Sequence, residues 1–188
     1  MPRRKSFDEE EAIKKAMDLF WKKGYESTSL ADLTKELGLG KGSFYATFKS
    51  KENLFNQCIK KYTDLNYPFL DKSLATESDF KLSLNKLLEG YIDGLISDNS
   101  RKGCFMANSC SLVNGNNKSV EKMIANHYSE IGSYFQNYLI KHGVDKTKAE
   151  SASAMIITFL IGASQQSKIN RDKSGYLVTI RNILALLD

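Results

Sequence analysis

The stretch "GLGKGSFYATF", Gly38–Phe48, combines three glycines, a lysine and three aromatic residues in eleven positions. Phe44 and Phe48 are four residues apart, so in a helix they share the face that packs against the rest of the protein. At about 100° per residue, the side chains that point away from this face are those of Gly42, Ser43 and Ala46. A glycine inside a helix costs roughly 1 kcal/mol relative to alanine, so we expect this small outer surface to serve the close approach of a partner.

The residues before this stretch predict two more helices. Ser6 and Glu9 have the spacing of a capping box at the start of the first helix, and Gly24 is placed to end it in a left-handed conformation. Ser29 can cap a second helix, whose apolar stripe consists of Leu30, Leu33 and Leu37. At most four residues, 38–41, separate this helix from the glycine-rich one. The two helices should therefore meet at a steep angle, as in a helix-turn-helix.

The positive charge of the chain is concentrated in the same region. Of a formal net charge of +5, residues 1–61 carry the larger part, with 13 Lys and Arg against 9 Asp and Glu. Lys41, Lys49 and Lys51 flank the outer surface of the glycine-rich helix. Backbone amides at the start of a fourth helix, capped by Ser50, add a second phosphate site. The charge suits a polyanion, although a modest excess on a helical surface more often serves solubility.

The stretch Gly24–Phe55 resembles the N-terminal DNA-binding module of the TetR/AcrR family of repressors. It matches the family in the glycine after the first helix, the leucine stripe, the Gly-Lys-Gly-Ser turn, the aromatic positions and Ser-Lys-Glu at 50–52. The resemblance implies that the partner is double-stranded DNA with a palindromic operator. It also implies which residues face the DNA, with Ser43 as a candidate base contact: Thr28, Lys41, Gly42, Ser43, Tyr45, Thr47 and Lys51. The chain departs from the family at Thr47 and Ala46, where the family often has a bulky His or Tyr and a larger polar residue.

The remainder of the chain predicts a second helical domain. The fourth helix, from Lys51, bridges into it and is expected to end near Pro68. Further helices are predicted over residues 80–96, 103–113, 120–142, 149–164 and about 177–187. The fold class is therefore all-α, with about nine helices in all. We expect a three-helix helix-turn-helix domain over residues 1–62 and a larger effector-binding and dimerisation domain over residues 63–188.

The segment 149–164 is apolar on more than one side, because small residues occupy nearly every turn around Met155, Ile156, Phe159 and Leu160. A partner subunit is the simplest cover. Together with the final helix, this segment can pair with its symmetry mate as a four-helix bundle, as the resemblance also implies. A homodimer is expected on a second ground, since two copies of a short recognition helix can read a palindrome.

The three cysteines, Cys58, Cys104 and Cys110, have no CxxC spacing, so neither a disulfide framework nor a metal site is expected, and no cofactor is indicated. Cys104 lies at the start of the helix predicted over residues 103–113, close to Arg101 and Lys102, which favours a thiolate and makes an electrophile or oxidant sensor one hypothesis. A small core residue is the plainer interpretation. A cysteine enzyme with His127 as base is a further hypothesis, but the sequence marks no orienting acid or oxyanion site, so no enzymatic activity is expected.

An unknown small-molecule effector is expected to bind among the later helices. Sites of this kind mix aromatic side chains with a few polar groups. The candidate positions are Tyr91, Cys104, Phe105, Asn108, Met123, His127 and Phe159. The effector would shift the dimer toward a form whose recognition helices no longer match the roughly 34 Å of one DNA turn, with the fourth helix as the transmitter.

Two features of the sequence indicate a soluble, cytoplasmic protein without a membrane partner. The longest apolar run, residues 154–163, is about half of the roughly 20 residues that span a bilayer. The N-terminal "MPRRKSFDEEE" has no apolar stretch after its basic residues, which argues against a secretory signal. We therefore expect a repressor that acts on DNA inside the cell.

Overall fold

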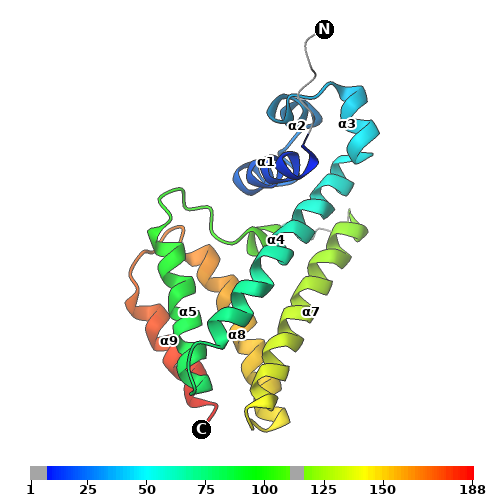
Figure 1. The fold of residues 1–188 in the computed structure, drawn as a ribbon. Coiled ribbons are helices and arrows are strands. Elements are labelled where there is room, and N and C mark those ends of the chain that lie inside the picture. Colours follow the sequence, from blue (N-terminus) through cyan, green and yellow to red (C-terminus); the bar gives the residue numbers. More distant parts are fainter. Residues whose placement is uncertain (1–7, 111–116) are drawn as a thin grey trace. The chain divides into compact units, whose positions relative to one another are not determined.

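The computed structural model describes residues 8–110 and 117–188, which form helices and their connections (Figure 1). Their contacts divide the chain into two compact units, Met1–Asp64 and Leu65–Asp188. The fold class is all-α, as predicted, with nine helices in the described residues. Their bounds are α1 Glu9–Lys23, α2 Leu30–Leu37, α3 Lys41–Phe48, α4 Lys51–Leu74, α5 Phe80–Ser97, α6 Phe105–Ser109, α7 Lys118–Lys141, α8 Lys146–Gln166 and α9 Ser174–Ala185.

Aromatic side chains form the centre of the first unit. Phe20 of α1 meets Phe55 of α4 edge to face, with 5.1 Å between ring centroids, and Tyr25 lies 4.7 Å from Phe55. Phe44 and Phe48 of α3 are fully buried, as their spacing predicts. Burial of these large rings contributes a large apolar area to the core of this small unit.

Both ends of α1 differ in detail from the prediction. Ser6 lies outside the described residues, and the N-cap is Asp8, whose carboxylate accepts the backbone N–H of Glu11 at 3.1 Å. Gly24 ends the helix with a positive φ of 81°, but its ψ of 156° lies outside the left-handed helical region. A short loop follows at once, so the chain leaves the helix extended instead of adding a left-handed turn.

The fourth helix is longer than predicted, because it continues through Pro68 to Leu74. Proline removes one helical hydrogen bond, which would join its own nitrogen to the carbonyl of Asp64. Both Pro68 and Asp64 are exposed, so water can reach that carbonyl. The last turn is held in the second unit, where Leu74 is buried and its carbonyl accepts the hydroxyl of Tyr138 at 3.3 Å.

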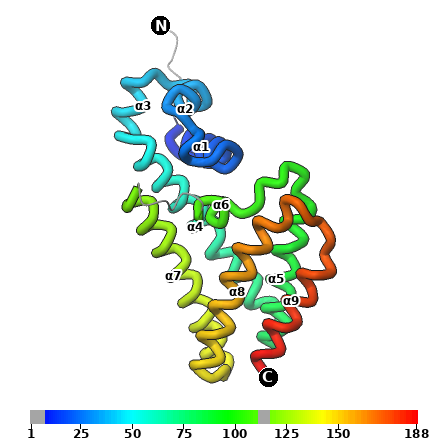
Figure 2. The backbone as a smooth tube through the Cα atoms, turned by 180° about the vertical axis from the view of Figure 1, so that it is seen from behind, coloured from blue at the N-terminus to red at the C-terminus, as the bar shows by residue number. Residues whose placement is uncertain are grey.

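The second unit is a bundle in which α8 contacts α7 and α9, and α9 contacts α5 (Figure 2). Its core is aliphatic and aromatic, and the side chains with no exposed surface include Leu88, Phe135, Ile156 and Ile180. The helix predicted over residues 103–113 is shorter where it is described, since α6 covers only Phe105–Ser109, and residues 111–113 lie outside the described residues. None of the described helices is both long and apolar enough to span a bilayer.

Candidate nucleic-acid interface

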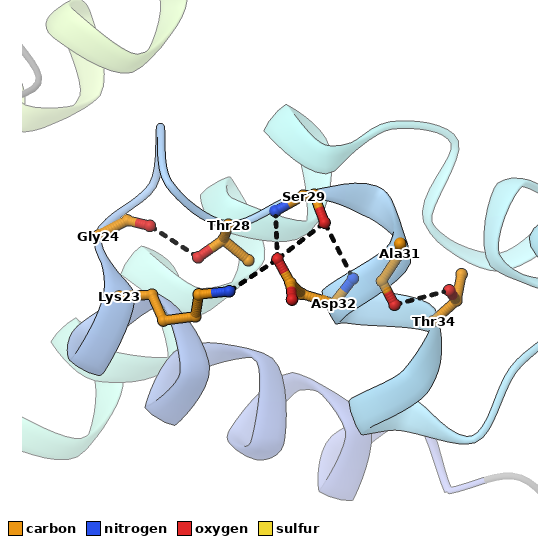
Figure 3. A network of polar contacts seen from close by, with 7 residues as sticks. All are labelled: Lys23, Gly24, Thr28, Ser29, Ala31, Asp32 and Thr34. Carbon is orange, nitrogen blue, oxygen red and sulfur yellow. Dashed lines mark hydrogen bonds and ion pairs between the residues drawn. The ribbon is translucent and has the colours of Figure 1, made fainter.

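A polar network fixes the start of α2 (Figure 3). The hydroxyl of Ser29 accepts the N–H of Asp32 at 3.1 Å, and the carboxylate of Asp32 accepts the N–H of Ser29 at 2.9 Å, which completes a capping box. Lys23, at the end of α1, pairs with the same carboxylate at 2.8 Å. The hydrogen bond from Lys23, together with those from Ser29, holds the pKa of Asp32 well below its usual range. The two helices are thus joined by charge as well as by packing.

Thr28 belongs to this connection and does not face outward. Its side chain is fully buried, and its hydroxyl donates to the carbonyl of Gly24 at 2.7 Å. A DNA contact at Thr28, which the resemblance implies, would therefore have to be made by its backbone and not by its buried side chain. Thr28 lies in the tight loop between α1 and α2. Its hydroxyl supplies the hydrogen-bond donor that the carbonyl of Gly24 needs inside this loop.

A left-handed glycine sets the turn into α3. Gly38 has φ 65° and ψ 30°, its N–H donates to the carbonyl of Lys35, and the N–H of Leu39 donates to the carbonyl of Thr34 at 2.9 Å. This pair of bonds is the Schellman arrangement that ends a helix and turns the chain. A side chain at position 38 would strain it, so this glycine has a geometric role that the sequence pattern predicts.

The surface of α3 has two unlike faces. Phe44 and Phe48 point inward, while the outward positions Lys41, Gly42, Ser43 and Ala46 are exposed. Tyr45 is 51% exposed. The half-buried Thr47 donates its hydroxyl to the carbonyl of Ser43 at 3.0 Å. Apart from the adjoining backbone of α3, no atom of the described residues lies within 4 Å of the point where a Cβ of Gly42 would stand, so packing among the described residues does not require glycine there.

The connection from α3 to α4 is strained. Lys49 has φ 64° and ψ −44°, and the N–H of Ser50 donates to the carbonyl of Phe48 at 2.7 Å. These values describe the γ-turn with a positive central φ, which is rare for a residue with a side chain. Ser50 caps α4 by accepting the N–H of Asn53 at 2.9 Å.

Lys51 is half-buried at the start of α4. Its ammonium lies 4.3 Å from the centroid of the Tyr25 ring, and burial lowers the pKa of Lys51. The ring restrains the ammonium by a cation–π contact, so it has less freedom than Lys41 or Lys49, which are exposed. The chain thus brings together, on and beside α3, all the predicted DNA-facing residues except Thr28.

The seven predicted effector positions lie on α5, α6, α7 and α8 and on the loop before α6. Phe105 is buried, and His127 is nearly so, with burial as the main cause that lowers its pKa. Met123 and Phe159 are half-buried on α7 and α8, and the hydroxyl of Tyr91 donates to the carbonyl of Leu160 at 3.0 Å. The half-buried Cys104 donates its backbone N–H to the hydroxyl oxygen of Ser164 at 2.7 Å.

A pocket of about 410 Å³ lies between α6 and α8, and Asn108 is the one predicted position that lines it. Its lining residues are Ala107, Asn108, Cys110, Ile161, Gln165 and Lys168. The three on or after α8 occur at intervals of four and three residues, which places them on one helical face. This spacing is the sequence pattern that could have identified these three residues as pocket-lining. A core helix that is apolar and has a polar end shows the same pattern, so the spacing alone does not identify a pocket.

Two protein-family models match this chain, one in each of its two compact units. Residues 12–58 match the family of bacterial regulatory proteins of the tetR type, and residues 82–180 match the C-terminal domain of LmrA/YxaF-like transcriptional regulators. The transcriptional repressor ComR of Escherichia coli K12 is 32% identical over 141 residues, which are 73% of this chain and 66% of ComR. The regulator YezE of Bacillus subtilis 168 is 29% identical over 58% of this chain and 56% of its own length. The chain thus matches less than two thirds of either relative.

One solved structure with a similar fold contains DNA. It is a double cysteine mutant of the TetR family transcriptional regulator CifR, complexed with 26-bp double-strand operator DNA. It superposes with a TM-score of 0.81 at 25% identity, over 97% of this chain and 98% of that chain. The likeness therefore extends over both units of the fold.

Proposed function

Because the chain belongs to the TetR family of bacterial regulatory proteins, we propose that it is a homodimeric transcriptional repressor that binds a palindromic operator through α3. A small-molecule effector releases it, and it acts in the cytoplasm, where the operator lies. The observation that carries this proposal is the construction of α3, with two buried phenylalanines behind an exposed surface of small side chains. A regulator of this family is not an enzyme, so we set aside the hypothesis that His127 activates Cys104.

The surface of α3 suits the DNA major groove, which is about 12 Å wide and admits one helix. At Gly42, Ser43 and Ala46 the side chains are small, so the helix backbone can come close to the base edges. Lys41 at one end of α3 and Lys49 at the other are exposed and can pair with phosphates. The first backbone amides of α4 offer a further phosphate contact.

Selection from random duplexes, followed by titration of the preferred sequence, tests this function. We expect an inverted repeat whose half-sites lie about one DNA turn apart, and an affinity that falls steeply with salt. Lys41→Ala should weaken binding about tenfold and reduce the salt slope by about one, while Lys60→Ala, nine positions beyond Lys51 on α4, should change neither. A salt-independent affinity, or no preference for any inverted repeat, would contradict the proposal.

A dimer is supported by apolar residues that the second unit leaves exposed on α8 and α9. Met155 is 44% exposed and Val178 is 47% exposed, although both lie on helices that also contribute to the core. Exposed apolar side chains on adjacent helices are typical of an interface. Met155→Glu should therefore yield a monomer in analytical ultracentrifugation, whereas Leu82→Glu, a similarly exposed position on α5, should not. A dimeric Met155→Glu protein would contradict this interface.

The alternative, a sensor based on Cys104, is favoured by the partial exposure of that residue. Cys58 is fully buried, and burial raises the pKa of its thiol, so it is shielded from reagents. N-ethylmaleimide separates the two hypotheses: a thiolate adds across its double bond, forming a C–S bond, and a solvent proton ends on the adjacent carbon. If Cys104 is the sensor, the reagent releases the wild-type protein from DNA but not Cys104→Ser. Equal release of both proteins would eliminate the thiol sensor.

A further inference from the structure

Three polar side chains that line the α6–α8 pocket form one hydrogen-bonded cluster. The ammonium of Lys168 donates to Oδ1 of Asn108 at 2.6 Å and to Oε1 of Gln165 at 2.9 Å. The amide nitrogen of Gln165 also donates to Oδ1 of Asn108 at 3.1 Å. We call Asn108, Gln165 and Lys168 the amide–lysine cluster.

Donors exceed acceptors in this cluster. An ammonium has three N–H donors and a primary amide has two, while each amide oxygen has two lone pairs. Among the described residues, Lys168 donates two bonds within the cluster and Gln165 donates one, so one N–H of each has no described acceptor, while Oδ1 of Asn108 already accepts two bonds. The unused capacity beside the pocket therefore favours a ligand that accepts hydrogen bonds.

The cluster also carries positive charge without an acidic neighbour in the pocket wall. Lys168 is the charged residue among the six that line the pocket, and both of its described acceptors are neutral amide oxygens. Burial lowers the pKa of Lys168, which is partly opposed by the nearby Cys104. A partly desolvated ammonium with neutral partners is stabilised by an anion more than a hydrated surface lysine would be.

The loop before α6 holds the cluster in place. The side-chain amide of Asn108 donates to the carbonyl of Lys102 at 2.7 Å, and the guanidinium of Arg101 donates to the carbonyl of Lys168 at 3.1 Å. The backbone N–H of Cys104 donates to the hydroxyl oxygen of Ser164, which lies within about one helical turn of Ile161 and Lys168. A site whose donors are already oriented loses less entropy when a ligand binds.

The rest of the pocket is apolar. Ala107, Cys110 and Ile161 supply its other walls, and its volume of about 410 Å³ is in the range of sites for small organic molecules. A free inorganic ion would leave this apolar wall in contact with water. The wall and the cluster together fit a molecule with an apolar body and one charged end.

We propose that the α6–α8 pocket binds a small organic carboxylate, whose anionic group pairs with Lys168 and accepts an N–H of Gln165, while its apolar body lies against Ala107 and Ile161. This inference rests on the proposed function in one respect, since it identifies the bound carboxylate as the class of the effector. Binding of a carboxylate to the pocket can be tested without DNA, so its outcome does not depend on operator binding.

Matched pairs of carboxylic acids and their primary amides, from acetate through benzoate to 1-naphthoate, test the site on the full-length protein. Calorimetry gives the affinities, and backbone amide shifts locate the ligand. We expect the aromatic acids to bind at least about tenfold more tightly than their amides, because only the acid forms a charge-assisted bond with Lys168. Shifts should concentrate at Ala107, Ile161 and Lys168.

Two variants make the result specific. Lys168→Met keeps an apolar stem and should abolish the preference for acid over amide, while Lys146→Met, which removes an exposed lysine from the start of α8, should preserve it. The site is refuted if no acid binds, if acids and amides bind equally, or if the preference survives in Lys168→Met. Operator binding without ligand, measured on the same preparations, reports separately on the proposed function, so the two can fail independently.

Discussion

The two short helices α3 and α6 both bury apolar side chains, but α6 has a polar anchor in addition. α3 is fixed by the rings of Phe44 and Phe48, which are buried among residues of neighbouring helices, and its outer face is left open. α6 has five residues, of which Phe105, Met106 and Ala107 are also buried, and hydrogen bonds to α8 and the residue Lys168 just after it, about 60 positions away in the chain, add a polar anchor. An apolar anchor tolerates change on its outer face, whereas a polar anchor depends on the position of each donor and acceptor.

Loss of the apolar anchor should have the largest effect. Phe44→Ala removes a fully buried ring and should destabilise the first unit by about 3–5 kcal/mol, as large-to-small core changes do. Chemical denaturation monitored by circular dichroism measures it. Tyr45→Ala, next in the chain but 51% exposed, should leave stability within about 0.5 kcal/mol and reduce operator affinity instead. Equal destabilisation by both changes would show that α3 has no inward and outward face.

The polar anchor can be tested at Gly103, which has φ 67° and lies against α8. A Cβ there would stand 2.8 Å from the hydroxyl oxygen of Ser164 and 3.0 Å from its carbonyl oxygen. Gly103→Ala should therefore cost about 3 kcal/mol, from the left-handed backbone and from the displaced contact together. Gly143→Ala is the matched control, because it has φ 85° with no atom within 4 Å and should cost about 1 kcal/mol. If the two variants have the same melting temperature, the close approach of the loop to α8 does not contribute to stability.

The difference between local and long-range contacts explains which parts of the structure the sequence could predict. The faces of α3 follow from the spacing of two phenylalanines, and the cap of α2 from Ser29, because the interactions involved are local. The end of α4 was mispredicted at Pro68, since the exposure of Asp64 and the packing of Leu74 depend on tertiary structure. The burial of Thr28 has a similar cause.

The pocket was the least predictable feature. Asn108 meets Gln165 and Lys168 across 57 and 60 positions of the chain, and no periodicity within one helix encodes such a contact. A choice of aromatic residues by their expected facing therefore selected side chains that pack into the core, such as Phe105. Polar clusters between helices require the three-dimensional arrangement before they can be recognised.

A smaller effect is expected at Lys49, where the connection after α3 is strained. Because the γ-turn at this residue has a positive φ, Lys49→Gly should stabilise the protein by about 1 kcal/mol, while Lys49→Ala should be nearly neutral. Melting temperatures of the three proteins measure the difference. If Lys49→Gly destabilised the protein, the entropy that glycine adds to the unfolded chain would outweigh the strain relieved in the γ-turn. The anchoring of α3 would then depend on packing alone.

The smallest effect concerns the capping box beside α3, which is polar but local. Lys23 and Ser29 depress the pKa of Asp32, so the folded protein binds a proton there less readily than the unfolded chain does. The stabilisation is therefore fully present above the unfolded pKa of about 3.9 and is lost as the pH falls toward the lower folded pKa. Asp32→Asn should lower the melting temperature slightly at pH 7, and the difference from wild type should shrink below about pH 4.

Thermal melts between pH 7 and pH 3 at low salt measure this pH dependence, with Glu36→Gln, an exposed change on the same helix, as the control. The pair of Lys23 and Asp32 is partly exposed, so salt should screen it, and the difference between wild type and Asp32→Asn should also narrow at high ionic strength. The salt-insensitive remainder reports the capping hydrogen bonds. If the whole difference persisted at pH 3, the charge of Asp32 would have no part in it, and neutral hydrogen bonds alone would account for the cap of α2.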